Sequence, residues 1–115
     1  MNLIILGAPG SGKGTQAKLL TEKFDLSHLS SGDLLRAEAV SGSAKGKIIA
    51  DLLAKGDLLP FETVLEVLEP AFKQARGGFI LDGTPRDVKQ AEYLDWFLQK
   101  NALQIDKVIY LSLPA

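Results

Sequence analysis

The feature that most constrains the fold is a glycine-rich segment that directly follows an apolar run near the start of the chain. Residues 2–6 read NLIIL and residues 7–16 read GAPGSGKGTQ. The apolar run is typical of a strand, and a helical pattern begins near Lys13. Successive backbone N–H groups and the positive end of a helix dipole then converge on one point. We interpret this segment as a phosphate-binding loop.

The spacing agrees with the phosphate-binding pattern G-x-x-x-x-G-K-[ST] except at its last position. Gly7, Gly12 and Lys13 fit the pattern. Gly14 stands where Ser or Thr is expected, and the hydroxyl follows one place later at Thr15. The alternative is a strand–turn–helix junction whose glycines serve only tight geometry. Lys13 argues against it, because a cation beside a helix N-terminus is disfavoured unless an anion lies between them.

Composition narrows the class of protein. The chain has 115 residues, enough for one modest domain with a core, and its 46% hydrophobic and 23% charged residues are ordinary for a globular protein. The net charge of −1 argues against a long nucleic acid partner. The absence of cysteine excludes disulfides and thiolate metal sites. With no signal peptide and no apolar run near 18 residues, we expect a cytoplasmic protein without a membrane partner.

Apolar runs and helical patterns alternate along the chain, which predicts βαβ units, right-handed crossovers and a parallel sheet. Strands are predicted over residues 2–6, 28–30, 79–81 and 107–113. Helices are predicted over residues 13–24, 31–39 and 44–55, from Pro60 to Gly77, and from Asp87 onward. The run at 79–81 is continuously apolar, as in a strand covered on both faces.

Periodicity also predicts which helical faces are buried. The helix after Pro60 is expected to place four residues inward and to kink at Pro70: Val64, Leu68, Ala71 and Ala75. The helix after Asp87 is expected to bury a stripe together with three aromatic residues: Ala91, Leu94, Leu98, Tyr93, Trp96 and Phe97. His28 is the single histidine and is interpreted as a strand residue without a chemical role.

Each polar motif follows the carboxyl end of a predicted strand. The glycine loop follows the first strand, residues 31–36 (SGDLLR) follow the second, and residues 82–86 (DGTPR) follow the third. Open α/β sheets bind ligands at that edge. The three motifs are therefore expected to form one site.

The segments GAPGSGKGTQ, SSGDLLR and LDGTPR, with Gln90 four residues beyond Arg86, resemble the adenylate kinase family over essentially the whole chain. The resemblance implies an α/β fold of the P-loop nucleoside monophosphate kinase type. Such a fold has a parallel sheet with helices on both faces, here truncated after the fourth strand. It also implies a single core over residues 1–115, with residues 30–59 as an inserted AMP-binding helical subdomain and no lid domain.

The resemblance implies a role for each matching residue. The catalytic residues would be Lys13, Arg86 and Arg36, and Asp82 would orient Mg²⁺ through water. The ATP phosphates would contact Gly10, Ser11, Gly12, Lys13, Gly14 and Thr15. AMP would contact Ser31, Arg36, Asp57, Leu58, Leu59, Gly83, Thr84, Pro85, Arg86 and Gln90.

Several of these residues also have a plainer explanation. Ser31 could act only as a helix cap, although a hydroxyl at a helix start with Arg36 one turn on also makes an anion site. Asp82 could simply end a strand, and Arg86 could be a solvated turn charge. Gln90 could serve only as a capping partner. The proximity of a phosphate-binding loop favours the active-site interpretation.

The implied reaction is transfer of the γ-phosphate of ATP to AMP, which yields two ADP. The chain departs from the family at Thr84, where phenylalanine is usual, at Ser31, where threonine is common, and by lacking the lid and its arginines. We therefore expect weak activity from this short chain, and self-association through the exposed edge of the fourth strand. The alternatives are a non-catalytic nucleotide-binding module and a kinase for another nucleoside monophosphate.

Overall fold

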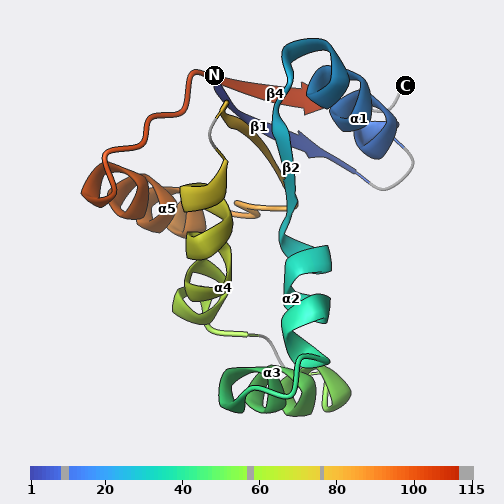
Figure 1. Ribbon diagram of the computed structural model, residues 1–115, viewed down its shortest axis with the longest axis vertical. Helices are drawn as coiled ribbons and strands as arrows, with labels where there is room; N and C mark the ends of the chain where they lie inside the picture. The colour runs from blue at the N-terminus through green and yellow to red at the C-terminus, as the bar shows by residue number, and fades with distance from the viewer. Residues whose placement is uncertain (9–10, 57–58, 76, 112–115) are drawn as a thin grey trace.

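The computed structural model describes residues 1–8, 11–56, 59–75 and 77–111. Strands and helices alternate as predicted (Figure 1). The described strands are β1 (Asn2–Gly7), β2 (Ser27–Ser30), β3 (Phe79–Asp82) and β4 (Lys107–Leu111). The described helices are α1 (Lys13–Phe24), α2 (Ser31–Ala39), α3 (Ala44–Ala54), α4 (Phe61–Gln74) and α5 (Val88–Lys100).

The strands form one parallel sheet in the order β2-β3-β1-β4. Asp82 at the end of β3 pairs in register with Ile5 of β1 on one side and with Ser30 of β2 on the other. The carboxyl ends of these strands therefore meet at one edge of the sheet. This confirms the predicted α/β class and brings the segments that follow these strands together.

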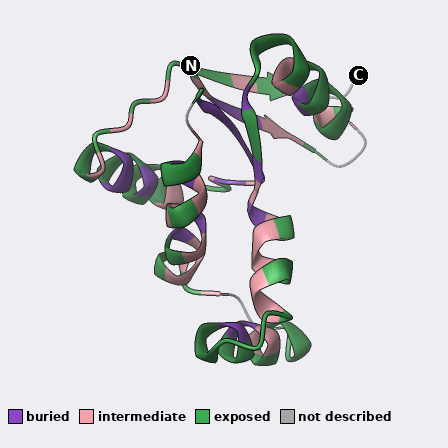
Figure 2. Cartoon of the chain, viewed as in Figure 1, coloured by how far each residue is buried: buried purple, intermediate pink, exposed green. Residues whose placement is uncertain are grey.

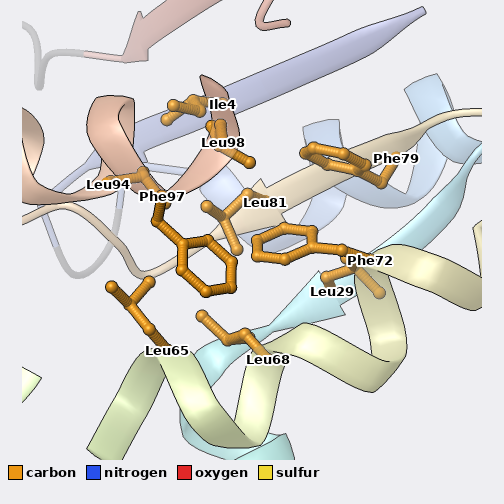
Figure 3. Close-up of a cluster of buried hydrophobic side chains, with 10 residues drawn as sticks. All are labelled: Ile4, Leu29, Leu65, Leu68, Phe72, Phe79, Leu81, Leu94, Phe97 and Leu98. Carbon is orange, nitrogen blue, oxygen red and sulfur yellow. The ribbon is translucent and has the colours of Figure 1, made fainter. Parts of the chain in front are cut away.

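The larger core lies between the sheet and helices α4 and α5 (Figure 3). The rings of Phe72 in α4 and Phe79 in β3 lie 4.9 Å apart between centroids, and Phe97 of α5 packs on Phe72 at 6.1 Å. The whole of β3 is buried, as its uninterrupted apolar run predicts. A rigid apolar layer therefore supports the strand that ends in Asp82.

Helix α1 covers the opposite face of the sheet, so helices lie on both faces as expected (Figure 1). Its Ala17 is fully buried against Leu3, Ile5 and Ile80. A small residue at this point lets the helix approach the sheet closely. This packing holds the N-terminus of α1 beside the end of β1.

Helices α2 and α3 extend away from the sheet, and much of their outer surface is exposed (Figures 1 and 2). Ser30 caps α2 by accepting a hydrogen bond from the Asp33 N–H, and Ser43 caps α3 in the same way through Gly46. A Cβ atom on Gly46 would lie 2.1 Å from the carbonyl oxygen of Glu38. Glycine is therefore what allows the two helices to pack this closely.

Most predicted boundaries are confirmed to within one residue. Helix α1 spans the predicted 13–24, and α3 ends at Ala54 with Lys55 as its C-cap. Pro70 lies inside α4, which runs as one helix from 61 to 74. The last strand is described to Leu111, so the predicted end at 113 lies outside the described residues.

One of the two predictions about buried faces is confirmed but incomplete, and the other, for α5, was wrong in part. On the α4 side, Leu68 is fully buried, and Val64, Ala71 and Ala75 are partly buried and pack against the same core. Leu65 and Phe72 are also fully buried, which the predicted stripe did not include. The buried face of α4 is broader than one stripe because α2, α5 and β2 all pack against this helix.

In α5, Trp96 is 56% exposed, Tyr93 is 37% exposed and Ala91 is exposed, while Phe97 is buried as predicted. The two exposed rings stack edge to face, and the ammonium group of Lys100 lies 5.1 Å from the Trp96 ring centroid. These aromatic residues lie on the solvent side of α5 because the inward stripe is already filled by Leu94, Phe97 and Leu98.

Candidate active site

The glycine loop ends at the N-terminus of α1, as the sequence predicts. Gly12 is the N-cap of the helix and has a left-handed φ of 84°, which glycine adopts without steric cost. A Cβ on Gly7 would lie 2.6 Å from the Ser11 hydroxyl oxygen, so the loop folds tightly back on β1. Within the described residues the buried Ser11 hydroxyl has no hydrogen-bond partner. Gly10 lies outside the described residues.

The carboxylate of Asp82 lies between two groups from distant parts of the chain. Its Oδ1 atom is paired with the ammonium group of Lys13, and its Oδ2 atom lies 3.0 Å from Nε2 of His28. The Asp82 side chain is 9% exposed. Such a buried charge requires partners, and both oxygens have one here.

His28 is a site residue that sequence reasoning missed. It lies in β2, as predicted, but its ring faces the end of β3. No spacing along the chain signals this contact, because it depends on β2 and β3 being neighbours in the sheet, with His28 two residues before the end of β2.

Ser31 begins α2 and also joins this helix to the end of β3. It is buried, and its hydroxyl donates to the carbonyl oxygen of Asp82 at 3.3 Å. The neighbouring Gly83 has a φ of 95°, and a Cβ atom there would lie 2.7 Å from the Ser31 hydroxyl oxygen. The start of α2 is therefore held tightly against the turn that follows β3.

Two cavities open at this edge of the sheet. The first, about 620 Å³, lies beside the glycine loop and is lined by Gly7, Ala8, Lys13, Gly83, Pro85 and Arg86 among others. The second, about 250 Å³, lies between α2, α4 and the turn after β3. Its lining includes six predicted AMP-binding residues, Ser31, Leu59, Gly83, Thr84, Arg86 and Gln90, together with Gly32, Leu35, Leu53, Phe61 and Val64.

Gly83 and Arg86 line both cavities. The turn after β3 is therefore a wall shared by two neighbouring spaces. The Arg86 side chain is anchored on this wall, because its Nε donates to the carbonyl oxygen of Gly83 at 3.2 Å. Its remaining guanidinium N–H groups are suited to bind an anion on either side.

Gln90 takes part in the cap of α5, and its side chain also binds the turn before the helix. Its backbone N–H donates to Oδ1 of Asp87 at 2.8 Å, which confirms the predicted cap of α5. Its side-chain Oε1 accepts from the backbone N–H of Arg86 at 2.9 Å, and the residue lines the second cavity.

Arg36 points elsewhere in this structure. Its guanidinium is paired with Asp33 on the exposed side of α2, and it is not among the described residues that line either cavity. This hydrogen bond holds the pKa of Asp33 below its usual value. The predicted contacts of Asp57 and Leu58 lie outside the described residues.

The described part of the chain holds no cluster of three or more His, Asp or Glu side chains that could bind a metal ion. Within the same residues, every helix is too short or too polar to cross a bilayer.

Comparison with known proteins agrees with this geometry. A model of the family "Adenylate kinase" matches residues 5–115. The chain is 48% identical over 117 residues to an adenylate kinase of Xanthomonas campestris pv. campestris (strain B100), covering 100% of this chain and 63% of that protein. It is 41% identical over 116 residues to an adenylate kinase of Clostridium tetani (strain Massachusetts / E88), covering 99% of this chain and 54% of that protein.

A mammalian relative gives a similar result over a shorter stretch. Adenylate kinase isoenzyme 1 of Sus scrofa is 50% identical over 93 residues, which cover 78% of this chain and 48% of that protein. The chain thus spans less than two thirds of the length of these relatives. Fold, site and similarity agree, and the chain belongs to the adenylate kinase family.

Proposed function

We propose that this chain binds ATP in the first cavity and AMP in the second, and that the γ-phosphate of ATP passes to AMP beside the turn that separates them. The observation that carries this proposal is the shared wall: Gly83 and Arg86 line both cavities. Transfer between two bound nucleotides requires neighbouring sites, because the reacting atoms must approach to about 3–3.5 Å. Residues 30–59 would then form the AMP-binding subdomain.

The first cavity has the groups that a polyphosphate requires. Lys13 lines it at the start of α1, where the helix dipole favours negative charge. The Ser11 hydroxyl is buried without a partner among the described residues, so a phosphate oxygen would satisfy it. Gly12, Gly14 and Thr15 would contribute backbone N–H groups or the hydroxyl from the same helix start.

The second cavity suits a nucleoside monophosphate. Its walls are largely aliphatic and aromatic, which favours a flat base, and Arg86 provides a cation for the phosphate. Arg36 would have to leave Asp33 to reach that phosphate, and its exposed position leaves the side chain free to do so.

Phosphoryl transfer needs no covalent intermediate, so these residues act mainly by alignment and by stabilising charge. Lys13 in the first cavity and Arg86 in the shared wall would both face the transferring group. Asp82 fits the role of a water-mediated Mg²⁺ contact, since it is a buried carboxylate whose ammonium partner can exchange it for phosphate. When bound with ATP, the ion would neutralise phosphate charge.

The proposal is tested by measuring ADP formation with ATP, Mg²⁺ and, in turn, AMP, UMP, CMP or GMP. Product with AMP in preference to the others supports the proposal. Preference for another monophosphate would support the kinase alternative. Calorimetric binding of ATP and AMP with no ADP formed would support the binding-module alternative. If neither ATP nor any of the monophosphates binds, the proposal and both alternatives are excluded.

We also propose that the chain self-associates through β4, which forms one edge of the sheet. Val108 is 58% exposed and Tyr110 is 71% exposed on this strand, and an unpaired apolar edge favours pairing with another strand. Light scattering over a range of concentrations tests this. A monomer at every concentration would contradict it. The cytoplasmic location expected from the sequence stays a prediction.

A further inference from the structure

The guanidinium of Arg36 lies against the wall of the second cavity without lining the cavity itself. Gly32, in the first turn of α2, is one of the lining residues. A Cβ atom on Gly32 would lie 3.2 Å from Nη1 of Arg36 and 3.3 Å from Nη2. Arg36 is not among the described residues that line the cavity. The cation is therefore close to the cavity but is directed to another partner.

That partner is the carboxylate of Asp33, one turn earlier in the same helix. Nη2 of Arg36 donates to Oδ1 of Asp33, and the structure describes no other acidic partner for this guanidinium. The backbone N–H of Asp33 donates to the Ser30 hydroxyl, which anchors the turn that carries the carboxylate. The side chains of Arg36 and Asp33 are 69% and 73% exposed, so both can change partner without disturbing the core.

A carboxylate and a phosphate are alternative acceptors for one guanidinium, because each offers it charged oxygens. A monophosphate in the second cavity must therefore compete with Asp33 for Arg36. The apparent affinity of a site falls in proportion to the fraction of molecules whose binding group is free. Exposed ion pairs are weak, so this competition lowers the affinity by a small factor and does not prevent binding.

We propose that Asp33 is an autoinhibitory positioning residue: its carboxylate holds Arg36 beside the second cavity, and the phosphate of a bound nucleotide must displace it. This inference rests on the proposed function, since it takes the acceptor nucleotide as the source of the displacing anion. Asp33 acts only through Arg36 and contacts no ligand. It sets the affinity of the second cavity for a phosphate-bearing ligand.

The experiment is a thermodynamic cycle. Wild type, Asp33→Asn, Arg36→Gln and the double variant are titrated by calorimetry with AMP and with adenosine, which lacks the phosphate. We expect Asp33→Asn to tighten AMP binding by about two- to fivefold and to leave adenosine binding unchanged. In the Arg36→Gln background the same substitution should have a smaller effect, because no guanidinium is released. The difference separates release of Arg36 from the general loss of a negative charge.

Two further variants serve as controls. Asp33→Glu keeps a carboxylate that can still pair with Arg36, so it should bind AMP as wild type does. Asp51→Asn removes the acidic member of another exposed ion pair, in which Nζ of Lys55 lies 3.0 Å from Oδ2 of Asp51. Neither of these two residues is among the described residues that line the two cavities. Asp51→Asn should therefore leave AMP affinity unchanged.

Several results would overturn the role of Asp33 while leaving the proposed function intact. Weaker AMP binding by Asp33→Asn would mean that the carboxylate presents Arg36 to the phosphate. Unchanged AMP binding would mean that the ion pair does not compete. Equal tightening in both backgrounds, or in Asp51→Asn, would be a general charge effect. AMP binding by Asp33→Glu as tight as that of Asp33→Asn would also contradict the proposal.

A different result would count against the proposed function itself. If wild type binds neither AMP nor adenosine, the proposed function fails and this inference fails with it. Asparagine has nearly the shape of aspartate, and the side chain is exposed, so the variant should fold. Thermal unfolding checks this, and Asp33→Ser takes its place in the cycle if Asp33→Asn is unfolded.

Discussion

Nε2 of His28 lies 3.0 Å from Oδ2 of Asp82, although 54 residues separate the two along the chain. A charged carboxylate only accepts hydrogen bonds, so Nε2 is the donor. The histidine occupies one carboxylate oxygen while Lys13 occupies the other. If the lysine turns toward a phosphate, the histidine still holds the carboxylate in place.

We expect His28→Leu to lower the free energy of unfolding by about 1–3 kcal/mol, because it leaves one oxygen of a buried carboxylate without its donor. His28→Gln should cost less, since an amide can also donate. Urea denaturation of the two variants measures this. Equal stabilities for wild type and His28→Leu would show that the hydrogen bond contributes nothing.

Lys13→Met should reduce turnover by about 10²–10³-fold and weaken ATP binding, since under the proposed function it removes the cation that would face the phosphates. Lys18→Met is the matched control, because Lys18 is an exposed residue of the same helix. The control should bind and react as wild type does. A Lys13→Met protein that keeps its fold and its affinity for ATP would contradict the assignment of the first cavity.

Gly46→Ala should destabilise the protein by about 1–3 kcal/mol, because the new Cβ would lie 2.1 Å from the backbone oxygen of Glu38 and the two helices would have to move apart. Gly14→Ala serves as a control for stability alone. Among the described residues, and apart from the adjacent residues and the helix's own backbone, no atom lies within 4 Å of a Cβ at that position, so alanine should stabilise α1 by up to about 1 kcal/mol. Chemical denaturation should show a lower free energy of unfolding for Gly46→Ala and a higher one for Gly14→Ala.

At acid pH, the pH dependence of the free energy of unfolding should include a contribution from Asp33. A hydrogen bond from Arg36 lowers the pKa of Asp33 from its usual 3.8. A carboxyl whose pKa is lower in the folded state stabilises the fold above pH 3.8, and this contribution is lost as the pH falls through the folded pKa. An NMR titration should give a pKa below 3.8 in wild type and a higher value in Arg36→Gln. An identical value in both would exclude the ion pair as its cause.

Local chemistry in the sequence predicted much of the fold. The helix start at Lys13, the helix start after Ser30, the cap at Asp87 and the apolar run at 79–81 are signals carried by adjacent residues, and each is confirmed. The residues of the turn after β3 that line the second cavity were named through the resemblance to the adenylate kinase family. That this turn lies beside the other motifs follows from the parallel sheet, because motifs that follow parallel strands meet at one edge.

What only the tertiary structure decided depends on contacts between distant segments. The order β2-β3-β1-β4 is what brings His28 to Asp82, and no spacing along the chain encodes that distance. Contacts between distant segments also decide the exposure of Trp96, because its helix has more apolar residues than the sheet can cover. Periodicity identifies an apolar residue, but only the packed neighbours determine whether it is buried, because burial depends on surfaces that other segments supply.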